Sequence, residues 1–318
     1  MIHASPLEAL VRDELFGEAP EAAEAIARQV HHRFGPAVAA VVFYGSCLRK
    51  QSAEGVLDLY VVVDDYRSAY GSRALAFANA LLPPNVFYVE TCDGETILRA
   101  KYAVISRADL ERAVGPTAIR PGAWARFCQP VRAVYARDEE ARRLLALVAA
   151  RSIRTAVLRG LGLLPRRDGA SSISPESFWQ GLFRETYASE LRPEREENIR
   201  ALYFAAPERY VATLRAVLAE LDLRGVLQLT EEDGGWRLEG ASALLGRPQR
   251  ARRWLAKAIG GAQLLKSAVT FGDWLPYALW KLERHTGTRL EPTPRQRRHP
   301  LLFAWPLIFR ALARRDLK

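Results

Sequence analysis

The sequence has few cysteines and no histidine cluster, and both absences exclude particular kinds of site. The three cysteines, Cys47, Cys92 and Cys128, have no paired spacing and make an odd count. This usage is typical of a reducing compartment and argues against a disulfide framework. The five histidines form no His-x-x-x-His pair with nearby acids, so a structural zinc site is not expected.

Long apolar runs are also missing from the sequence. The longest of them, such as LLFAWPLIF (301–309), are too short to span a bilayer. The first 17 residues contain early acids and no apolar h-region, so no signal peptide is expected. Hydrophobic residues make up 49% of the chain and charged residues 26%, which predicts a globular protein with an ample core.

Positive charge is concentrated near the C-terminus. The net charge is +10, and residues 244–318 hold 16 Lys and Arg against 4 Asp and Glu. The rest of the chain is therefore slightly acidic. A near-neutral body with a strongly basic end indicates a polyanionic partner, either nucleic acid or an anionic membrane surface. With the Arg- and Ala-rich composition, we expect a bacterial cytoplasmic protein, peripheral on the inner face of the cytoplasmic membrane.

Apolar spacing and turn residues predict an α+β chain of two domains and a tail. Residues 1–137 are predicted to form a mixed β-sheet domain of four or five strands, residues 138–272 a mainly helical, winged-helix-like domain, and residues 273–318 a basic amphipathic tail. Strands are predicted at AAVVFYG (39–45), LDLYVVVD (57–64), a hairpin over 86–106, and PVRAVYA (130–136). Helices are predicted at 6–16, 20–34, 72–82, 138–164, 175–190, 195–221 and 248–271, with a second small hairpin at 226–240.

The stretch VVFYGSCLRKQSAEGVLDLYVVVDD (41–65) contains the most informative motif. A Gly45-Ser46 turn after a strand lets backbone N–H groups and a hydroxyl approach a triphosphate closely. An acid at the start of the next strand, here Asp58, can hold the Mg²⁺ that bridges those phosphates. A second acid two residues on is missing, since Tyr60 stands there. By itself the stretch is better interpreted as an ordinary turn followed by a capped strand.

Asp64 and Asp65 do not replace the missing acid. Asp58 and Asp64 alternate onto one face of the strand but lie roughly 20 Å apart along it, too far to share a metal. Both Asp64 and Asp65 are interpreted as the polar end of the strand.

Several segments along the chain agree with this motif. They are YGSCLRKQ (44–51), LDLYVVVDD (57–65), LRAKYAVIS (98–106), ETYASELR (185–192) and, more weakly, QLLKSAVTFG (263–272). Together they resemble the nucleotidyltransferase superfamily that includes polymerase beta, and within it the mitochondrial translocator-maintenance family of phosphatidate cytidylyltransferases. The chain departs from the family where Cys47 and Ala103 replace Gly and where Glu190 replaces Asp.

The resemblance implies a nucleotidyltransferase-like fold and a Mg²⁺-dependent reaction of CTP with phosphatidate, giving CDP-diacylglycerol and pyrophosphate in phospholipid biosynthesis. It implies CTP, phosphatidate and an anionic membrane surface as partners, and nucleic acid is not expected. Lys101, Glu190, Arg192 and Lys266 each have an ordinary alternative, as surface or ion-paired side chains. The implied catalytic residues are Asp58, Ser46, Lys101 and Glu190. The implied binding residues are Gly45, Ser46, Gln51, Tyr187, Arg192 and Lys266, and Arg151 and Arg154 are weaker candidates. The implied metal ligands are Asp58 and Glu90.

One carboxylate is chemically sufficient for such a reaction. A polymerase must deprotonate a sugar hydroxyl, and its second metal ion assists that step. Phosphatidate attacks through a phosphate monoester whose second pKa is about 6, so this nucleophile is already ionised at neutral pH. We therefore hypothesise one essential Mg²⁺, held by Asp58 and the CTP phosphates.

Two other functions fit the same residues. One is a nucleotidyltransferase acting on RNA or a small molecule, although the basic tail contains no recognisable RNA-binding module. The other is a non-catalytic binding module with a decayed site, for which Tyr60 is the best argument.

The tail generates a prediction about membranes. Residues 273–284 place apolar side chains on one helical face and either pack on the body or meet a membrane, whereas 301–315 combine aromatics with flanking arginines, as interfacial segments do. Deleting residues 290–318 is expected to reduce co-sedimentation with anionic liposomes. Unchanged binding of the truncated protein would refute the membrane role.

Overall fold

The structure is a computed structural model, and it confirms a mixed α+β chain. It describes residues 5–93, 96–165, 170–190, 195–241, 244, 250–270, 292–294 and 296. The predicted tail helix at 273–284, the interfacial segment at 301–315 and Arg192 therefore lie outside the described residues.

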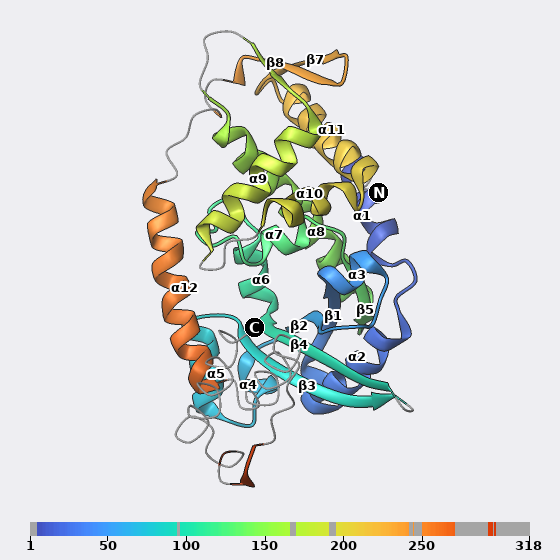
Figure 1. Ribbon diagram of the computed structural model, residues 1–318, viewed down its shortest axis with the longest axis vertical. Coiled ribbons are helices and arrows are strands. Elements are labelled where there is room, and N and C mark those ends of the chain that lie inside the picture. Colours follow the sequence, from blue (N-terminus) through green and yellow to red (C-terminus); the bar gives the residue numbers. More distant parts are fainter. Residues whose placement is uncertain are drawn as a thin grey trace, which may run out of the picture.

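A five-stranded mixed sheet forms the lower half of the molecule in Figure 1. Its order is β3-β4-β2-β1-β5, in which β2 and β4 run parallel and the other neighbours antiparallel. All five strands were predicted, and the predicted number of four or five strands is confirmed as five. The strands are β1 (Val38–Tyr44), β2 (Leu57–Val63), β3 (Asn85–Asp93), β4 (Thr96–Ser106) and β5 (Arg132–Ala136).

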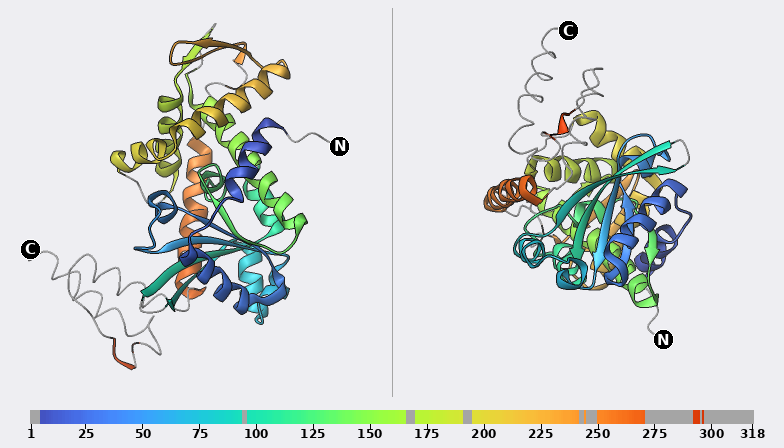
Figure 2. Two further views of the ribbon diagram at one scale, coloured as in Figure 1. Left: turned by 90° about the vertical axis from the view of Figure 1, so that its right-hand side faces the viewer. Right: turned by 90° about the horizontal axis from the view of Figure 1, so that it is seen from below.

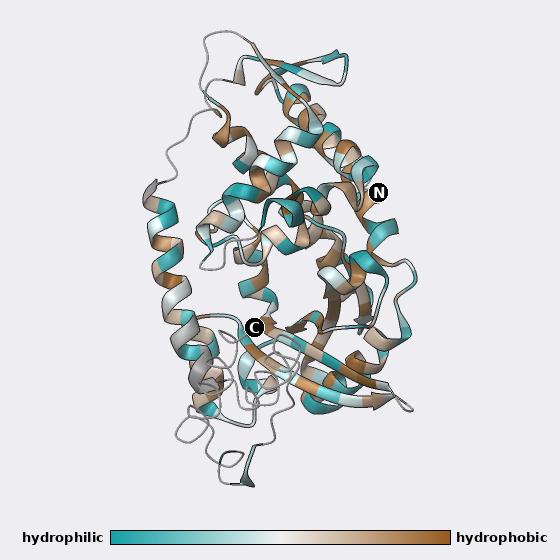
Figure 3. Ribbon diagram, viewed as in Figure 1, coloured by the Kyte–Doolittle hydropathy of each residue, from teal (hydrophilic) through white to brown (hydrophobic). Residues whose placement is uncertain are grey.

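Side chains of the central strands alternate between two buried clusters, because successive residues of a strand point to opposite faces. Val41 and Phe43 pack with α2 (Glu21–Phe34), whereas Val42 packs on the other face with α1 (Pro6–Leu15) and with α8 (Glu139–Leu163). The apolar colouring of the central sheet in Figure 3 reflects this two-sided burial. The cluster on the α8 side runs without interruption from the sheet into the helical half of the chain.

The helical half agrees with the prediction except at one helix boundary and in one added strand. The predicted helix 195–221 is wrong as a single element, because the structure divides it into α10 (Glu196–Phe204) and α11 (Pro207–Leu223). Pro207 occupies the first turn of the new helix, where its missing N–H is not needed. The predicted hairpin is confirmed as β7 (Gln228–Glu232) and β8 (Gly235–Glu239), which join an unpredicted strand, β6 (Ser171–Ile173), in a second sheet of order β6-β8-β7.

Several short helices were also not predicted, since segments of four to seven residues do not complete a clear helical period. They are α3 (Ser46–Lys50), α4 (Tyr66–Ala69), α6 (Arg107–Ala113) and α7 (Trp124–Phe127). Two predicted helices, α5 (Arg73–Leu81) and α9 (Pro175–Ser189), are confirmed within a residue or two.

The helix α12 (Arg250–Thr270) connects the two halves of the molecule along one side (Figures 1 and 2). Near its start, Arg253 forms a bidentate ion pair with Glu185 of α9. Towards its end, the Lys266 amine donates to the carbonyls of Leu82 and, at 3.0 Å, Pro84, just before β3. These contacts place α12 as a wall beside the sheet.

Within the described part of the chain, no helix is both long enough and apolar enough to cross a membrane.

Candidate functional site

The Gly-Ser turn and Asp58 meet where β1 ends and β2 begins. Tyr44, the last residue of β1, pairs in register with Asp58. Gly45 has φ of 92°, a backbone conformation that favours glycine, and a Cβ on it would lie 2.8 Å from Asp58 Oδ2. The turn therefore depends on glycine for two reasons, backbone conformation and space. The two parts of the predicted motif are in contact.

Lys101 lies directly beside Asp58 on the parallel neighbour β4. The two residues are register partners, and the Lys101 amine is 2.9 Å from Asp58 Oδ1. Both side chains keep some solvent access, 31% and 19%. The predicted carboxylate and the predicted cation thus form an ion pair at the Gly-Ser turn.

The other residues of the Gly-Ser segment lie in or directly after α3. Ser46 is exposed as the first residue of α3, and Gln51 is exposed at its C-terminal end with a positive φ of 48°. Cys47 is buried, and its thiol donates to the Val56 carbonyl at 3.5 Å. This contact ties α3 to the loop that leads into β2.

Tyr60 occupies the position of the missing acid and forms part of a packed aromatic group. Its ring lies 5.2 Å from that of Tyr44 and 5.3 Å from that of Phe127, measured between centroids. Its hydroxyl donates to the Gly122 carbonyl at 3.2 Å, and only 6% of the residue is exposed. Burial is the main cause that raises the pKa of Tyr60, so the hydroxyl stays neutral.

Glu190, the predicted second carboxylate, is bound by an arginine that was not predicted. Arg126 of α7 forms a bidentate ion pair with it, in which Nη2 donates to Oε2 at 3.0 Å. Burial acts to lower the pKa of Arg126, but the charge and hydrogen bonds of Glu190 outweigh it and raise that pKa. Tyr187, half-buried on α9, lies close enough to act on the same guanidinium.

Glu90 lies away from Asp58, on the far side of β4. Its carboxylate accepts from the Tyr88 hydroxyl at 2.6 Å and from Arg99 Nε at 3.1 Å. Two strand spacings and a two-residue offset put the Cα atoms of Glu90 and Asp58 roughly 12 Å apart. The two acids do not share a cation in this arrangement, and the described residues contain no group of three or more metal-ligating side chains.

Lys266 holds α12 to the loop before β3, as described above, and it is not among the residues that line the cleft described below. Burial, together with the nearby charge of Arg120, lowers its pKa to about 8. Asp64 and Arg154 also serve the fold. Asp64 pairs with Arg107 and Arg137, and Arg154 pairs with Glu220. Arg151 lies against Gly115, whose added Cβ would come within 3.0 Å of its guanidinium.

A cleft of about 610 Å³ opens at Tyr44, the residue before the Gly-Ser turn; Gly45, Ser46, Asp58 and Lys101 are not among the residues that line it. Its floor is the sheet face that carries Tyr44, Tyr60 and Ala103, and α12 forms a wall opposite α6. The volume lies within the ~300–1,000 Å³ of small-molecule sites. Arg112, Arg120 and Arg126 line it, and none of them was predicted. They belong to a segment, 107–129, in which no element was predicted from the sequence.

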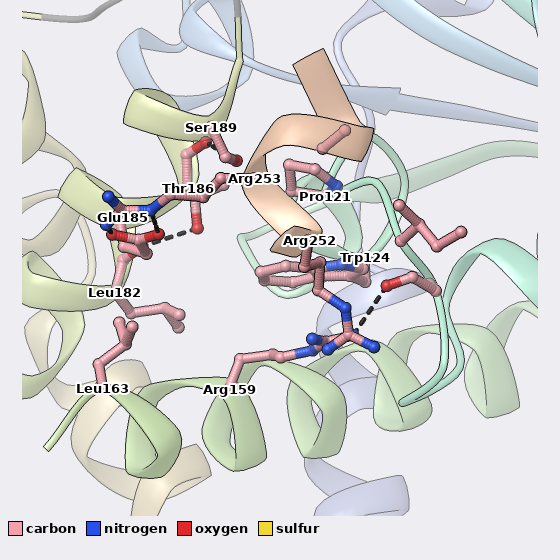
Figure 4. Close-up of a pocket in the computed structure, with 13 residues that line it drawn as sticks. Pro121, Trp124, Arg159, Leu163, Leu182, Glu185, Thr186, Ser189, Arg252 and Arg253 are labelled. Carbon is pink, nitrogen blue, oxygen red and sulfur yellow. Dashed lines mark hydrogen bonds and ion pairs between the residues drawn. The ribbon is translucent and has the colours of Figure 1, made fainter. Parts of the chain in front are cut away.

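A second, smaller cavity of about 40 Å³ lies next to this cleft, between α8, α9 and the start of α12. Figure 4 shows Arg253 reaching Glu185, and Arg159 reaching towards the loop that carries Pro121. Arg159 donates to the Ala118 carbonyl at 2.7 Å. These contacts anchor α12 and the 118–124 loop, the two elements that border the larger cleft.

Comparison with known proteins adds no assignment. No family model matches the chain, and no curated protein matches it. The resemblance described above therefore depends on its own segments and on the geometry of their residues.

The packing around Tyr60 predicts the effect of restoring the missing acid. Tyr60→Asp is expected to lower the free energy of unfolding by about 3–5 kcal/mol, because it opens a cavity and buries a carboxylate near Asp58. Tyr60→Phe is expected to cost about 1 kcal/mol, the usual value of one hydrogen bond. Urea denaturation measures both. A stable Tyr60→Asp protein with tighter Mg²⁺ binding would show instead that this position accepts a second metal ligand.

The depressed pKa of Lys266 predicts a pH dependence. The ¹³Cε resonance of Lys266, assigned with Lys266→Met, is expected to titrate with a midpoint near pH 8. Arg120→Gln is expected to move the midpoint upwards, because it removes a like charge. Since the folded pKa lies below the unfolded value, the contribution of Lys266 to the free energy of unfolding rises as pH increases from about 8 towards 10.5. A midpoint near 10.5 in the folded protein would contradict this environment.

Proposed function

We propose that this protein is a Mg²⁺-dependent nucleotidyltransferase that transfers the cytidylyl group of CTP to phosphatidate, forming CDP-diacylglycerol and pyrophosphate. The observation that carries the proposal is the contact of Gly45 with Asp58, beside Lys101 and at the edge of the cleft. A tight glycine turn, an acid and a cation at one sheet edge are the parts needed to bind a metal-bound triphosphate.

The triphosphate would lie at the Gly45-Ser46 turn. The first N–H groups of α3 have no acceptor within their own helix, and the exposed Ser46 hydroxyl is beside them. Lys101 supplies a positive charge that a phosphate can share with Asp58. Glycine at position 45 allows the backbone to come close to such a ligand.

The donor set fits one magnesium ion. Mg²⁺ takes oxygen ligands, keeps several waters, and is commonly bound by one or two carboxylates together with substrate phosphates. Asp58 is the carboxylate at the turn, whereas Glu190 is occupied by Arg126 and Glu90 lies two strands away. Asp58 would hold the ion together with the CTP phosphates, and the ion would neutralise charge on the triphosphate.

The reaction balances without a general base. An oxygen of the phosphatidate phosphate forms a bond to the α-phosphorus of CTP, and the bond from that phosphorus to the bridging oxygen of the β-phosphate breaks. Pyrophosphate leaves with the electron pair. Because the second pKa of a phosphate monoester is about 6, the nucleophile has already lost its proton at neutral pH. A site whose other carboxylates are paired with arginines is compatible with this chemistry.

A non-catalytic nucleotide-binding module is the second candidate. The observations that favour it are the Asp58–Lys101 ion pair, which neutralises the carboxylate, and the packed tyrosine at the position of the second acid. A transferase that acts on RNA or a small molecule differs from the main proposal only in the acceptor substrate that binds in the cleft.

The test is pyrophosphate release by the full-length protein with CTP, Mg²⁺ and phosphatidate. Asp58→Asn is expected to lower kcat/KM on the order of 10²-fold, because it removes a charge that binds the metal-bound triphosphate. Asp13→Asn makes the same change on the exposed face of α1 and is expected to have no effect. Both proteins should give the same circular dichroism spectrum.

Three outcomes would contradict parts of the proposal. No release with any acceptor, but binding of CTP, would identify a binding module. Release with RNA or a small alcohol but not with phosphatidate would identify another transferase. A titration in which activity requires two tightly bound Mg²⁺ ions would refute the single-ion hypothesis.

A further inference from the structure

The charged residues that line the large cleft are paired with one exception. Two carboxylates line it, and each is bound by a lining arginine, Asp109 by Arg112 and Glu190 by Arg126. The remaining lining cation is Arg120. Within the described ranges its guanidinium makes no hydrogen bond and no ion pair. Glu190 acts on it through its charge but is already bound by Arg126.

The surroundings of Arg120 make this charge costly. The side chain is half-buried, and burial is the main cause that lowers its pKa. Tyr60 and Glu190 oppose this shift only in part, and the neighbouring charge of Arg126 adds to it. A cation withdrawn from water without a partner is unfavourable, and buried charges are normally paired. A ligand anion in the cleft would supply the missing partner.

Arg120 lies near Tyr60, on the same sheet face as the proposed nucleotide-binding turn at Gly45 and Asp58. It stands two residues before Gly122, whose carbonyl accepts the Tyr60 hydroxyl. Tyr60 in turn follows Asp58 by two residues on the same face of β2, about 7 Å along the strand. The charge of Arg120 acts on Tyr60, and both residues line the cleft, so an anion held by Arg120 would lie on the same side of the sheet as the Asp58 turn.

The rest of the cleft is mostly apolar. Val86 and Ile105 contribute to the sheet floor, Ile259 projects from α12, and Ile119 lies beside Arg120. A free inorganic anion would leave these surfaces unused. A molecule with a phosphate at one end and hydrocarbon at the other matches both the single unpaired guanidinium and the apolar walls.

We propose that Arg120 binds the phosphate monoester of an amphiphilic acceptor whose hydrocarbon part lies between the sheet face and α12. The planar guanidinium donates two parallel hydrogen bonds to phosphate oxygens, an arrangement that a lysine amine does not reproduce. This assignment names the acceptor subsite of the proposed reaction and rests on that function for the identity of the acceptor. Arg120 is a binding residue in this account, and Asp58 and Lys101 remain at the nucleotide end.

The experiment is isothermal titration calorimetry of the full-length protein without nucleotide. The probes are dihexanoyl phosphatidate, inorganic phosphate and dihexanoyl phosphatidylcholine, the last of which carries no phosphate monoester. The variants are Arg120→Gln, Arg120→Lys and the control Arg28→Gln, which removes an exposed arginine of α2. Circular dichroism establishes that each variant is folded.

Arg120→Gln is expected to weaken phosphatidate binding roughly 30-fold or more, the range for removing one partner of a buried charge pair. Arg120→Lys is expected to weaken it less, and Arg28→Gln not at all. If Arg120→Gln does not fold, Arg120→Lys carries the test. Equal affinity in the folded Arg120 variants overturns the proposal. Phosphatidylcholine binding as tightly as phosphatidate, or inorganic phosphate doing so, overturns the assigned ligand class.

Activity measured on the same samples separates this inference from the proposed function. Arg120→Gln is expected to raise KM for phosphatidate and to leave KM for CTP unchanged. Arg120-dependent phosphatidate binding without pyrophosphate release would retain the lipid-phosphate subsite and reject the transferase. Pyrophosphate release that is indifferent to Arg120 would retain the transferase and reject the subsite.

Discussion

The antiparallel pairing of β1 with β2 is the constraint on which the site depends. It brings the glycine that follows one strand against the acid near the start of the next, so closely that a Cβ on Gly45 would be 2.8 Å from Asp58 Oδ2. Parallel pairing of β2 with β4 then sets Lys101 beside the same acid. Both strands are buried on both faces, so their register is fixed by the core and the site cannot slide along them.

The charged side chains that line the cleft near this turn differ in whether they are ion-paired. Arg126 forms an ion pair with Glu190, and Arg112 forms one with Asp109; all four residues line the cleft. Both acids that line the cleft are thus bound by arginines. Arg120 makes no ion pair with any of the described residues and lies next to apolar walls. The cleft consequently has one site for an anion and a larger surface for hydrocarbon, which agrees with an ionised lipid phosphate as nucleophile.

The helix α12 gives the cleft its far wall and joins it to both halves of the molecule. Its first turn is fixed by the ion pair of Arg253 with Glu185 of α9, and its later part by the hydrogen bonds of Lys266 to carbonyls before β3. Lys266 is therefore explained by a structural contact, although the resemblance implied a role in binding. The same helix contributes Ile259 to the apolar lining.

The sequence alone determined the five strands, the long helices and the pairing of Gly45-Ser46 with Asp58, because these depend on local patterns of period 2 or 3.6 and on one short motif. It did not determine the break before Pro207, where apolar spacing continues across two helices. Nor did it locate Arg120 and Arg126, since α6, α7 and the loop between them are too short to produce a periodic pattern. The Asp58–Lys101 and Arg126–Glu190 pairs join residues 43 and 64 positions apart. Only tertiary structure decides such pairs, because strand register and helix docking, rather than local sequence, choose the partner of a charge.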